Sequence, residues 1–187
     1  MKRYQITEWC HHFIREHVKE GDLCIDATAG NGNDTLLLCE LVGDTGTVLA
    51  FDIQEEAIAH TKERLEKAGV AKRAQVHLES HVKMGAYVQE ASVSCIVFNF
   101  GYLPGGDHSL ATKKETSVKA VREGLKLLKK GGMMSLCIYS GGDSGFEERD
   151  ALLEAVKNLD GKQYLVIASA YYNRPNNPPI PVMIFKL

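Results

Sequence analysis

Two hydrophobic patterns alternate along most of the chain. Short apolar runs predict buried strands at residues 23–26, 47–52, 75–78, 94–99 and 133–139. Elsewhere apolar residues recur every three or four positions, which predicts helices that follow residue 35, cover residues 55–69 and 112–130, and include residues 152–159. An N-terminal helix with Ile6, Trp9, Phe13 and His17 on one face should lie over the sheet or over the mouth of a site. The alternation predicts an α/β fold with helices on both faces of a parallel sheet.

The turn after the first predicted strand is rich in glycine. Residues 26–35 read DATAGNGNDT and lead directly into the next helix. Glycine lets a backbone turn sharply and lets a ligand approach closely, and a helix start offers unpaired N–H groups. Thr35 stands where the dinucleotide fingerprint G-x-G-x-x-G needs its third glycine, so that fingerprint is incomplete. The alternative is a glycine turn that binds no ligand.

The remaining pattern, Asp26-x-Thr28-x-Gly30-x-Gly32, resembles the first motif of the class I S-adenosylmethionine (SAM) methyltransferases, with Thr28 in place of the first glycine. In that family the acidic residue and the glycine loop hold the amino-acid end of SAM. The resemblance therefore implies a cofactor-binding loop composed of Asp26, Thr28, Gly30, Asn31, Gly32, Asn33 and Asp34.

Two later strand ends are expected to complete the cofactor site. Asp52 ends the second strand, twenty residues after Gly32, where such folds place the acceptor for both ribose hydroxyls. Alternatively, Asp52 caps the following helix together with Glu55. In the SAM family, the residues after the third strand commonly meet adenine, which the resemblance carries to Ser80 and His81. Their alternative roles are a helix cap and a solvated first-turn residue. The residues expected at the cofactor from these two strand ends are Asp52, Ile53, Gln54, Ser80 and His81.

The end of the fourth strand indicates the chemistry. Asn99-Phe100-Gly101-Tyr102 has the spacing of the N-P-P-Y motif of methyltransferases that modify amino groups, although both prolines are replaced. In those enzymes the Asn carbonyl and a following backbone carbonyl accept the protons of the amine, and the aromatic ring stacks on the target. The resemblance implies Asn99 and Tyr102 as catalytic residues, with Asn99 and Gly101 also at the cofactor. A purely structural turn is the alternative.

Substrate contacts are expected around this motif, because loops on a rigid scaffold usually carry them. The helix at 112–130 has the densest basic stretch, which could follow phosphates or simply face solvent. The expected substrate-binding residues are Tyr102, Leu103, Pro104, Gly105, Gly106, Asp107, Lys113, Tyr139, Arg174 and Asn176.

The last thirty residues change character. Apolar runs at 164–171 and 181–185 are joined by a proline-rich segment that is too short for a helix, so the two strands should pair as an antiparallel hairpin. Arg174 and Asn176 in this segment offer donors suited to phosphates or base edges, unless the segment is only a stiff connection or a dimer contact. A terminal hairpin is typical of the seven-stranded Rossmann-like sheet of SAM methyltransferases, whereas an NAD-binding Rossmann domain ends with a parallel strand.

Composition narrows the remaining choices. With 187 residues and 44% hydrophobic content, the chain is expected to form one domain over residues 1–187. The net charge of −2 argues against coating nucleic acid through bulk electrostatics, although a local basic patch is compatible with it. Neither a signal peptide nor a membrane span is evident, so we expect a cytoplasmic protein. The five cysteines are scattered singly and read as reduced core residues, and no metal site is expected from Cys10, His11 and His12.

Over essentially all of its length the sequence resembles the small bacterial family known as rRNA methylases. Its marks here are DATAGNGNDT and, at residues 99–107, NFGYLPGGD. Members of that family look like tRNA methyltransferases that act on 5-aminomethyl-2-thiouridine at the wobble position. The resemblance implies SAM as cofactor, the tRNA anticodon loop as substrate and a homodimer. The alternatives are an rRNA methyltransferase, a SAM-binding protein without turnover, and an NAD oxidoreductase, which Thr35 and the hairpin disfavour.

Overall fold

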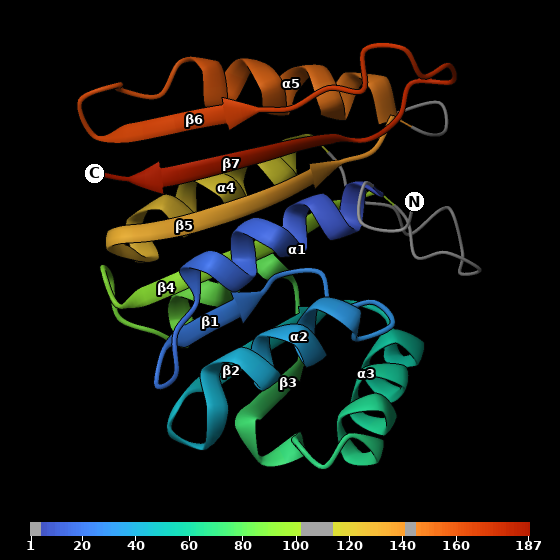
Figure 1. Ribbon diagram of the computed structural model, residues 1–187, viewed down its shortest axis with the longest axis vertical. Helices are drawn as coiled ribbons and strands as arrows, with labels where there is room; N and C mark the ends of the chain where they lie inside the picture. Colours follow the sequence, from blue (N-terminus) through green and yellow to red (C-terminus); the bar gives the residue numbers. More distant parts are fainter. Residues whose placement is uncertain (1–4, 102–113, 141–144) are drawn as a thin grey trace.

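The computed structural model describes residues 5–101, 114–140 and 145–187. Its described strands form one seven-stranded sheet in the order β3-β2-β1-β4-β5-β7-β6 (Figure 1). All neighbouring strands run parallel except β7, which is antiparallel to both β5 and β6. The predicted parallel sheet and its terminal hairpin are thereby confirmed. The strands are β1 (Leu23–Asp26), β2 (Thr47–Asp52), β3 (Ala74–Leu78), β4 (Val93–Phe100), β5 (Leu128–Ile138), β6 (Tyr164–Ala168) and β7 (Ile180–Lys186).

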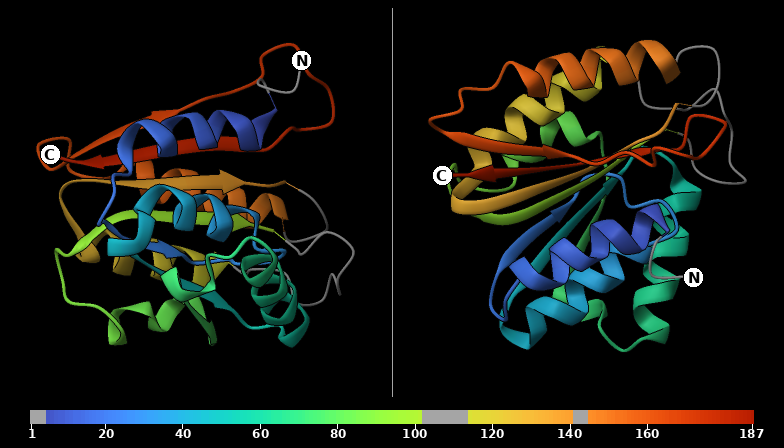
Figure 2. Two further views of the ribbon diagram at one scale, coloured as in Figure 1. Left: turned by 60° about the horizontal axis from the view of Figure 1, so that its bottom comes forward. Right: turned by 45° about the horizontal axis from the view of Figure 1, so that its top comes forward.

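Helices cover both faces of the sheet (Figure 2). One core layer joins α1, α2 and α3 to the sheet, and a second layer joins η4, α4 and α5 to its other face. Strand β4 shows why both layers form. Its side chains alternate, so that Cys95 and Val97 enter the first layer while Ile96 and Phe98 enter the second. The helices are α1 (Ile6–His17), α2 (Asn33–Val42), α3 (Glu55–Lys67), α4 (Lys114–Leu127) and α5 (Gly145–Lys157), with 3-10 turns η2 (Gly43–Thr45), η3 (Ala71–Arg73) and η4 (His81–Ala86).

All five cysteines are buried and none forms a disulfide, as the scattered single positions predicted. No described helix is long and apolar enough to cross a membrane. Helix α1 packs against β5 and β7, so its predicted place over the sheet is confirmed. Its buried face is displaced from the predicted one. Cys10 and Ile14 are buried, whereas Trp9 and Phe13 flank them and are only half-buried.

The predicted helix at residues 112–130 is wrong at its C-terminal end. Helix α4 ends at Leu127, and the residues that follow open strand β5. The reason is a contact that is distant in sequence. The Lys186 ammonium donates to the carbonyls of Leu125 and Leu128, at 3.1 and 2.7 Å, and thereby satisfies the end of the helix. Lys129 is then drawn to Asp22 at 2.9 Å.

The basic stretch on α4 is partly neutralised. Lys114 lies 3.6 Å from Glu147, and Lys126 lies 2.9 Å from Glu123. Lys119 and Arg122 are exposed. Ion pairs between exposed side chains are weak and screened by salt, so these cations can still exchange their partners for phosphates.

Candidate functional site

A cavity of about 880 Å³ opens at the carboxyl ends of β1, β2 and β4, where parallel α/β sheets bind their ligands. Helix α1 and the turns that follow these strands form its walls. The structure brings most predicted cofactor residues together there. Those lining the cavity are Thr28, Gly30, Asn31, Asn33, Asp34, Asp52, Ile53, Gln54, Ser80, His81, Asn99 and Gly101. Asp26 and Gly32 do not line it.

The glycine loop is held by contacts to its backbone. Gly30 N donates to Asp52 Oδ2 at 2.9 Å, and Thr61 Oγ1 donates to the Gly30 carbonyl at 3.1 Å. Gly32 has φ +74°, and a Cβ there would lie 2.9 Å from Thr61 Cα. Glycine at this position therefore permits the close approach of α3 to the loop, and the loop wall of the cavity is fixed by main-chain geometry.

Both carboxylate oxygens of Asp52 accept hydrogen bonds from backbone N–H groups. Oδ2 accepts from Gly30 N, and Oδ1 accepts from Gln54 N at 3.0 Å. The capping residue of α3 is Gln54, so the alternative that Asp52 caps this helix is wrong. An ionised carboxylate offers about four acceptor positions, so its remaining lone pairs stay available to hydroxyl donors in the cavity.

Asp26 supports the loop from beneath. It is fully buried, its Oδ1 accepts from Thr28 N at 3.2 Å, and its Oδ2 accepts from Thr35 Oγ1 at 2.6 Å. Thr35, which interrupts the dinucleotide fingerprint, is thus the hydroxyl partner of this carboxyl. Burial, followed by the charge of Asp34, raises the pKa of Asp26 to about 7.

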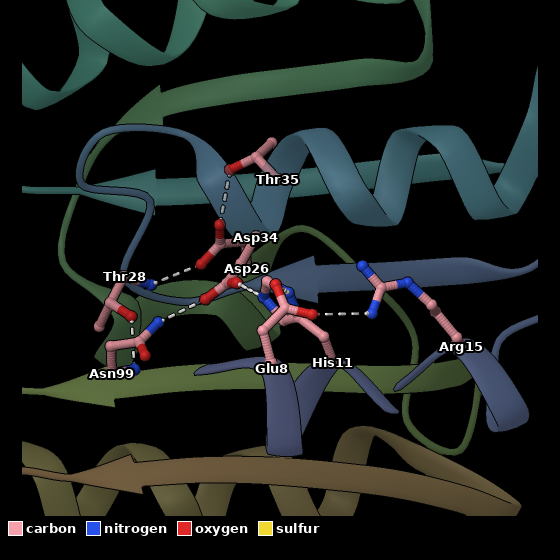
Figure 3. A network of polar contacts seen from close by, with 8 residues as sticks. All are labelled: Glu8, His11, Arg15, Asp26, Thr28, Asp34, Thr35 and Asn99. Carbon is pink, nitrogen blue, oxygen red and sulfur yellow. Dashed lines mark hydrogen bonds and ion pairs between the residues drawn. The ribbon is translucent and has the colours of Figure 1, made fainter. Parts of the chain in front are cut away.

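A chain of side-chain contacts links the end of β4 to α1 (Figure 3). Asn99 N donates to Thr28 Oγ1 at 2.7 Å, and Asn99 Nδ2 donates to Asp34 Oδ2 at 2.6 Å. Asp34 Oδ1 lies 2.5 Å from His11 Nε2. Glu8 continues the chain, 3.8 Å from His11 Nδ1 and 3.6 Å from Arg15. The polar groups of α1, α2 and β4 therefore form one continuous wall of the cavity.

Ser80 and His81 begin η4 at another part of the wall. Ser80 accepts from Val82 N at 3.5 Å and is the capping residue of η4, as its alternative role predicted. His81 is not a solvated first-turn residue. Its ring packs edge-on against Phe98 and Phe100, and burial lowers its pKa, so the imidazole is neutral at pH 7. Its Nε2 is buried and finds no partner among the described residues.

The expected substrate residues are distributed unevenly. Tyr102, Leu103, Pro104, Gly105, Gly106, Asp107 and Lys113 lie outside the described residues. Tyr139 lines the cavity, and burial raises the pKa of its phenol. Arg174 and Asn176 lie on the exposed connection between β6 and β7, where Asn176 adopts φ +64°, and neither lines the cavity.

Comparisons with known proteins identify the family of this chain. The family model described as "Putative rRNA methylase" matches residues 48–185. The tRNA (mnm(5)s(2)U34)-methyltransferase, chloroplastic, of Arabidopsis thaliana is 37% identical over 98% of this chain and 70% of its own length. This chain belongs to the rRNA methylase family. It is accordingly a SAM-dependent methyltransferase.

Two solved structures agree with this family assignment. A protein of Clostridium thermocellum described as a "putative rRNA-methylase" is 42% identical, with a TM-score of 0.95 and 98% of each chain covered. A "putative methyltransferase" of Streptococcus mutans, solved in complex with SAH, is 38% identical, with a TM-score of 0.88 and 97% of each chain covered. SAH is the product that SAM leaves after giving up its methyl group.

The residues of this chain fit SAM. SAM carries two cationic groups, a sulfonium and an ammonium, and the five carboxylates that line the cavity favour cations. These are Glu8, Asp34, Glu40, Asp52 and Glu79. Among the described residues, no group of three or more His, Cys, Asp or Glu side chains is placed to hold a metal ion.

A place for α1 over the mouth of a site was one of the two predicted alternatives, but sequence reasoning missed which of its residues line the cavity. Its residues Thr7, Glu8, His11 and Arg15 all line the wall. The only available signal was that Glu8, His11 and Arg15 recur at spacings of three and four, which places them on one polar helix face.

Proposed function

We propose that this chain transfers a methyl group from SAM to the amino group of 5-aminomethyl-2-thiouridine at position 34 of tRNA. The observation that carries the proposal is the fixed amide of Asn99 at the end of β4. Its Nδ2 is occupied by Asp34, and no described donor reaches its Oδ1. The amide therefore presents an acceptor, which an amine requires and a hydroxylate or carbanion does not.

The protonation of the target supports this reading. An aliphatic amine is an ammonium at neutral pH, and only the neutral amine has a lone pair for the reaction. Desolvation in the cavity and the nearby sulfonium both favour the neutral form. A close carboxylate would stabilise the ammonium form of the target. A neutral carbonyl such as Asn99 Oδ1 instead accepts a hydrogen bond from the amine without stabilising that positive charge.

The transfer itself needs mainly alignment. When bound, SAM supplies a methyl carbon activated by a cationic sulfur. The amine nitrogen forms the N–C bond in line with the breaking C–S bond, the sulfur keeps that electron pair, and one amine proton is released to water. Asn99 fixes the direction of the nitrogen, and we propose that the ring of Tyr102 stacks on the uracil. Asp52 would accept the ribose hydroxyls, and Ser80 and His81 would meet the adenine.

A tRNA substrate suits the charge distribution of the protein. The wobble base lies in a single-stranded loop, so it can be splayed into a cavity at modest cost. Stem phosphates would meet local cations such as Arg174 and the exposed Lys119 and Arg122, which a net charge of −2 permits. The Arabidopsis relative carries the name of this reaction. A homodimer and a cytoplasmic location stay predictions.

Nucleoside mass spectrometry tests the proposal. In tRNA from cells that lack this protein, 5-aminomethyl-2-thiouridine should accumulate and its methylated product should vanish. Re-expression of the wild type should restore the product, and re-expression of Asn99→Ala should not. The name of the matching family favours a second candidate, an rRNA methyltransferase. Unchanged wobble nucleosides together with loss of a methyl group from rRNA would establish that candidate instead.

A further inference from the structure

The polar face that α1 turns toward the cavity has no role in the function proposed above. His11 is its most enclosed member, with a side chain that is 13% exposed, whereas Glu8 is 40% exposed and Arg15 is 47% exposed. Its Nε2 lies 2.5 Å from Asp34 Oδ1. Because an ionised carboxylate only accepts hydrogen bonds, Nε2 is the donor in this contact.

The contact matters because an asparagine amide can present either of two faces. A half-turn of the Asn99 amide would exchange Oδ1 for Nδ2 and place a donor where the amine needs an acceptor. The Nδ2 bond to Asp34 Oδ2, at 2.6 Å, is the one described contact of this side chain that opposes such a turn. The orientation of Asn99 therefore depends on Asp34.

The position of the Asp34 carboxylate depends in turn on the contact that its other oxygen, Oδ1, makes with His11. Its carboxylate lies close enough to the buried Asp26 that its charge raises the pKa of Asp26, so Asp34 stands beside a carboxyl that does not attract it. Among the described side chains, His11 and Asn99 are the donors that hold Asp34. Without His11, the carboxylate keeps one of these two bonds and can rotate about its side-chain torsions.

We propose that His11 is a positioning residue for methyl transfer, which holds Asp34 so that Asn99 directs its carbonyl oxygen at the substrate amine. The inference rests on the proposed function for the identity of the amine. Helix α1 lies outside the βα turns that hold the glycine loop. The proposal therefore gives this helix a part in positioning the groups that act in methyl transfer.

The kinetic test compares three variants. His11→Leu removes the donor, His11→Gln restores an N–H near the position of Nε2, and His12→Leu changes the exposed neighbour on the same helix. With tRNA that carries 5-aminomethyl-2-thiouridine, His11→Leu should lower kcat by about 10- to 100-fold, as a small misalignment does. Its Kd for SAM should change less than about threefold. His11→Gln should recover most of kcat, and His12→Leu should match the wild type.

A second readout needs no substrate. The side-chain NH₂ signals of Asn99, assigned by their loss in Asn99→Ala, report whether Nδ2 is hydrogen-bonded. They should move toward free-amide positions in His11→Leu and stay in place in His11→Gln. The same spectra show whether each variant is folded.

The outcomes separate the two ideas. An active wild type with an equally active His11→Leu, or unmoved Asn99 signals in that variant, overturns the positioning role alone. A wild type that is inactive on this RNA overturns the proposed function, while displaced Asn99 signals in His11→Leu would still support the positioning of the amide. A loss of activity in His11→Leu that disappears at saturating SAM would assign His11 to cofactor binding and overturn the inference.

Discussion

The two walls of the cavity are built differently. The loop wall, residues 28–31, is held through its backbone, by Asp52 at Gly30 N and by Thr61 at the Gly30 carbonyl. The helix wall, formed by His11, Asp34 and Asn99, is held by contacts between side chains. In the loop wall the atoms held in place belong to the main chain, so its surface does not depend on the rotamers of residues 28–31. In the helix wall side chains hold one another, and the chain of contacts loses its geometry when one member is removed. We therefore expect the loop wall to govern cofactor affinity and the helix wall to govern turnover.

The largest expected effect is on kcat, in a variant that removes Asn99 from the end of the helix wall. Asn99→Ala removes the acceptor for the amine and should lower kcat by about 10²- to 10³-fold, as the loss of one preorganised polar group in an active site does. Because the loop wall is untouched, affinity for SAM should fall far less than kcat does, although Asn99 is also expected at the cofactor. Single-turnover kinetics at saturating SAM measures the first quantity, and isothermal calorimetry measures the second.

Asn158→Ala is the matched control, since Asn158 is exposed and its side chain bonds only Glu154 among the described residues. If Asn99→Ala loses SAM affinity but turns over normally at saturation, the division between the two walls is wrong.

The loop wall is broken by Asp52→Ala. This change removes the acceptor of Gly30 N and Gln54 N and the expected acceptor of the ribose hydroxyls. Affinity for SAM should fall by about 2–4 kcal/mol, because charge-assisted bonds in a half-buried site are lost. Calorimetric titration measures this, with the exposed Glu55→Ala on the next helix as a control. Unchanged affinity in a folded variant would exclude Asp52 from the cofactor site.

The difference between the walls also explains what the sequence could predict. The loop wall is local. A strand that ends in Asp26, two glycines and a second strand that ends in Asp52 imply one another, because the carboxyl ends of parallel strands converge. The terminal hairpin was equally accessible, since its connecting segment leaves no room for a helix.

The helix wall could not be predicted in the same way. Its contacts join His11 to Asp34 and Asp34 to Asn99, and the second pair is 65 residues apart in sequence. Periodicity shows that α1 has a polar face but does not fix where that face points. The end of α4 was mispredicted for a similar reason, because the cation that satisfies its last carbonyls comes from Lys186.

The carboxyl beneath both walls provides a test through pH. The pKa of Asp26 is raised to about 7 in the folded protein, whereas an unfolded aspartate titrates near 3.9. The folded state thus binds the Asp26 proton more tightly than the unfolded state does. The stability that this protonated carboxyl contributes is present below about pH 4 and lost as the pH rises through about 7. Asp26→Asn lacks this proton. Its free energy of unfolding relative to the wild type should therefore rise between pH 4 and 7, by about 3 kcal/mol.

Urea unfolding at several pH values measures this difference. Asn at position 26 can still accept from Thr28 N, and the Thr35 hydroxyl can turn to accept from its NH₂, so the variant should keep the loop. Asp160→Asn, at an exposed position, is the control and should show no comparable trend. A difference for Asp26→Asn that stays constant with pH would mean that Asp26 titrates normally in the folded protein.

The smallest expected effect concerns the far anchor of α1. Trp9 Nε1 donates to Ser169 Oγ at 3.2 Å, just beyond the end of β6, and this bond ties the helix that carries His11 to the C-terminal hairpin. A neutral, partly buried hydrogen bond contributes about 0.5–1.5 kcal/mol, so Ser169→Ala should destabilise the protein by about that amount. A double-mutant cycle with Trp9→Phe isolates the pair from the loss of packing. If α1 is held only through side chains, the same variants should lower turnover slightly while SAM affinity stays constant. Strict additivity in the cycle would show that this bond contributes nothing, and α1 would then be anchored by its packing against β5 and β7.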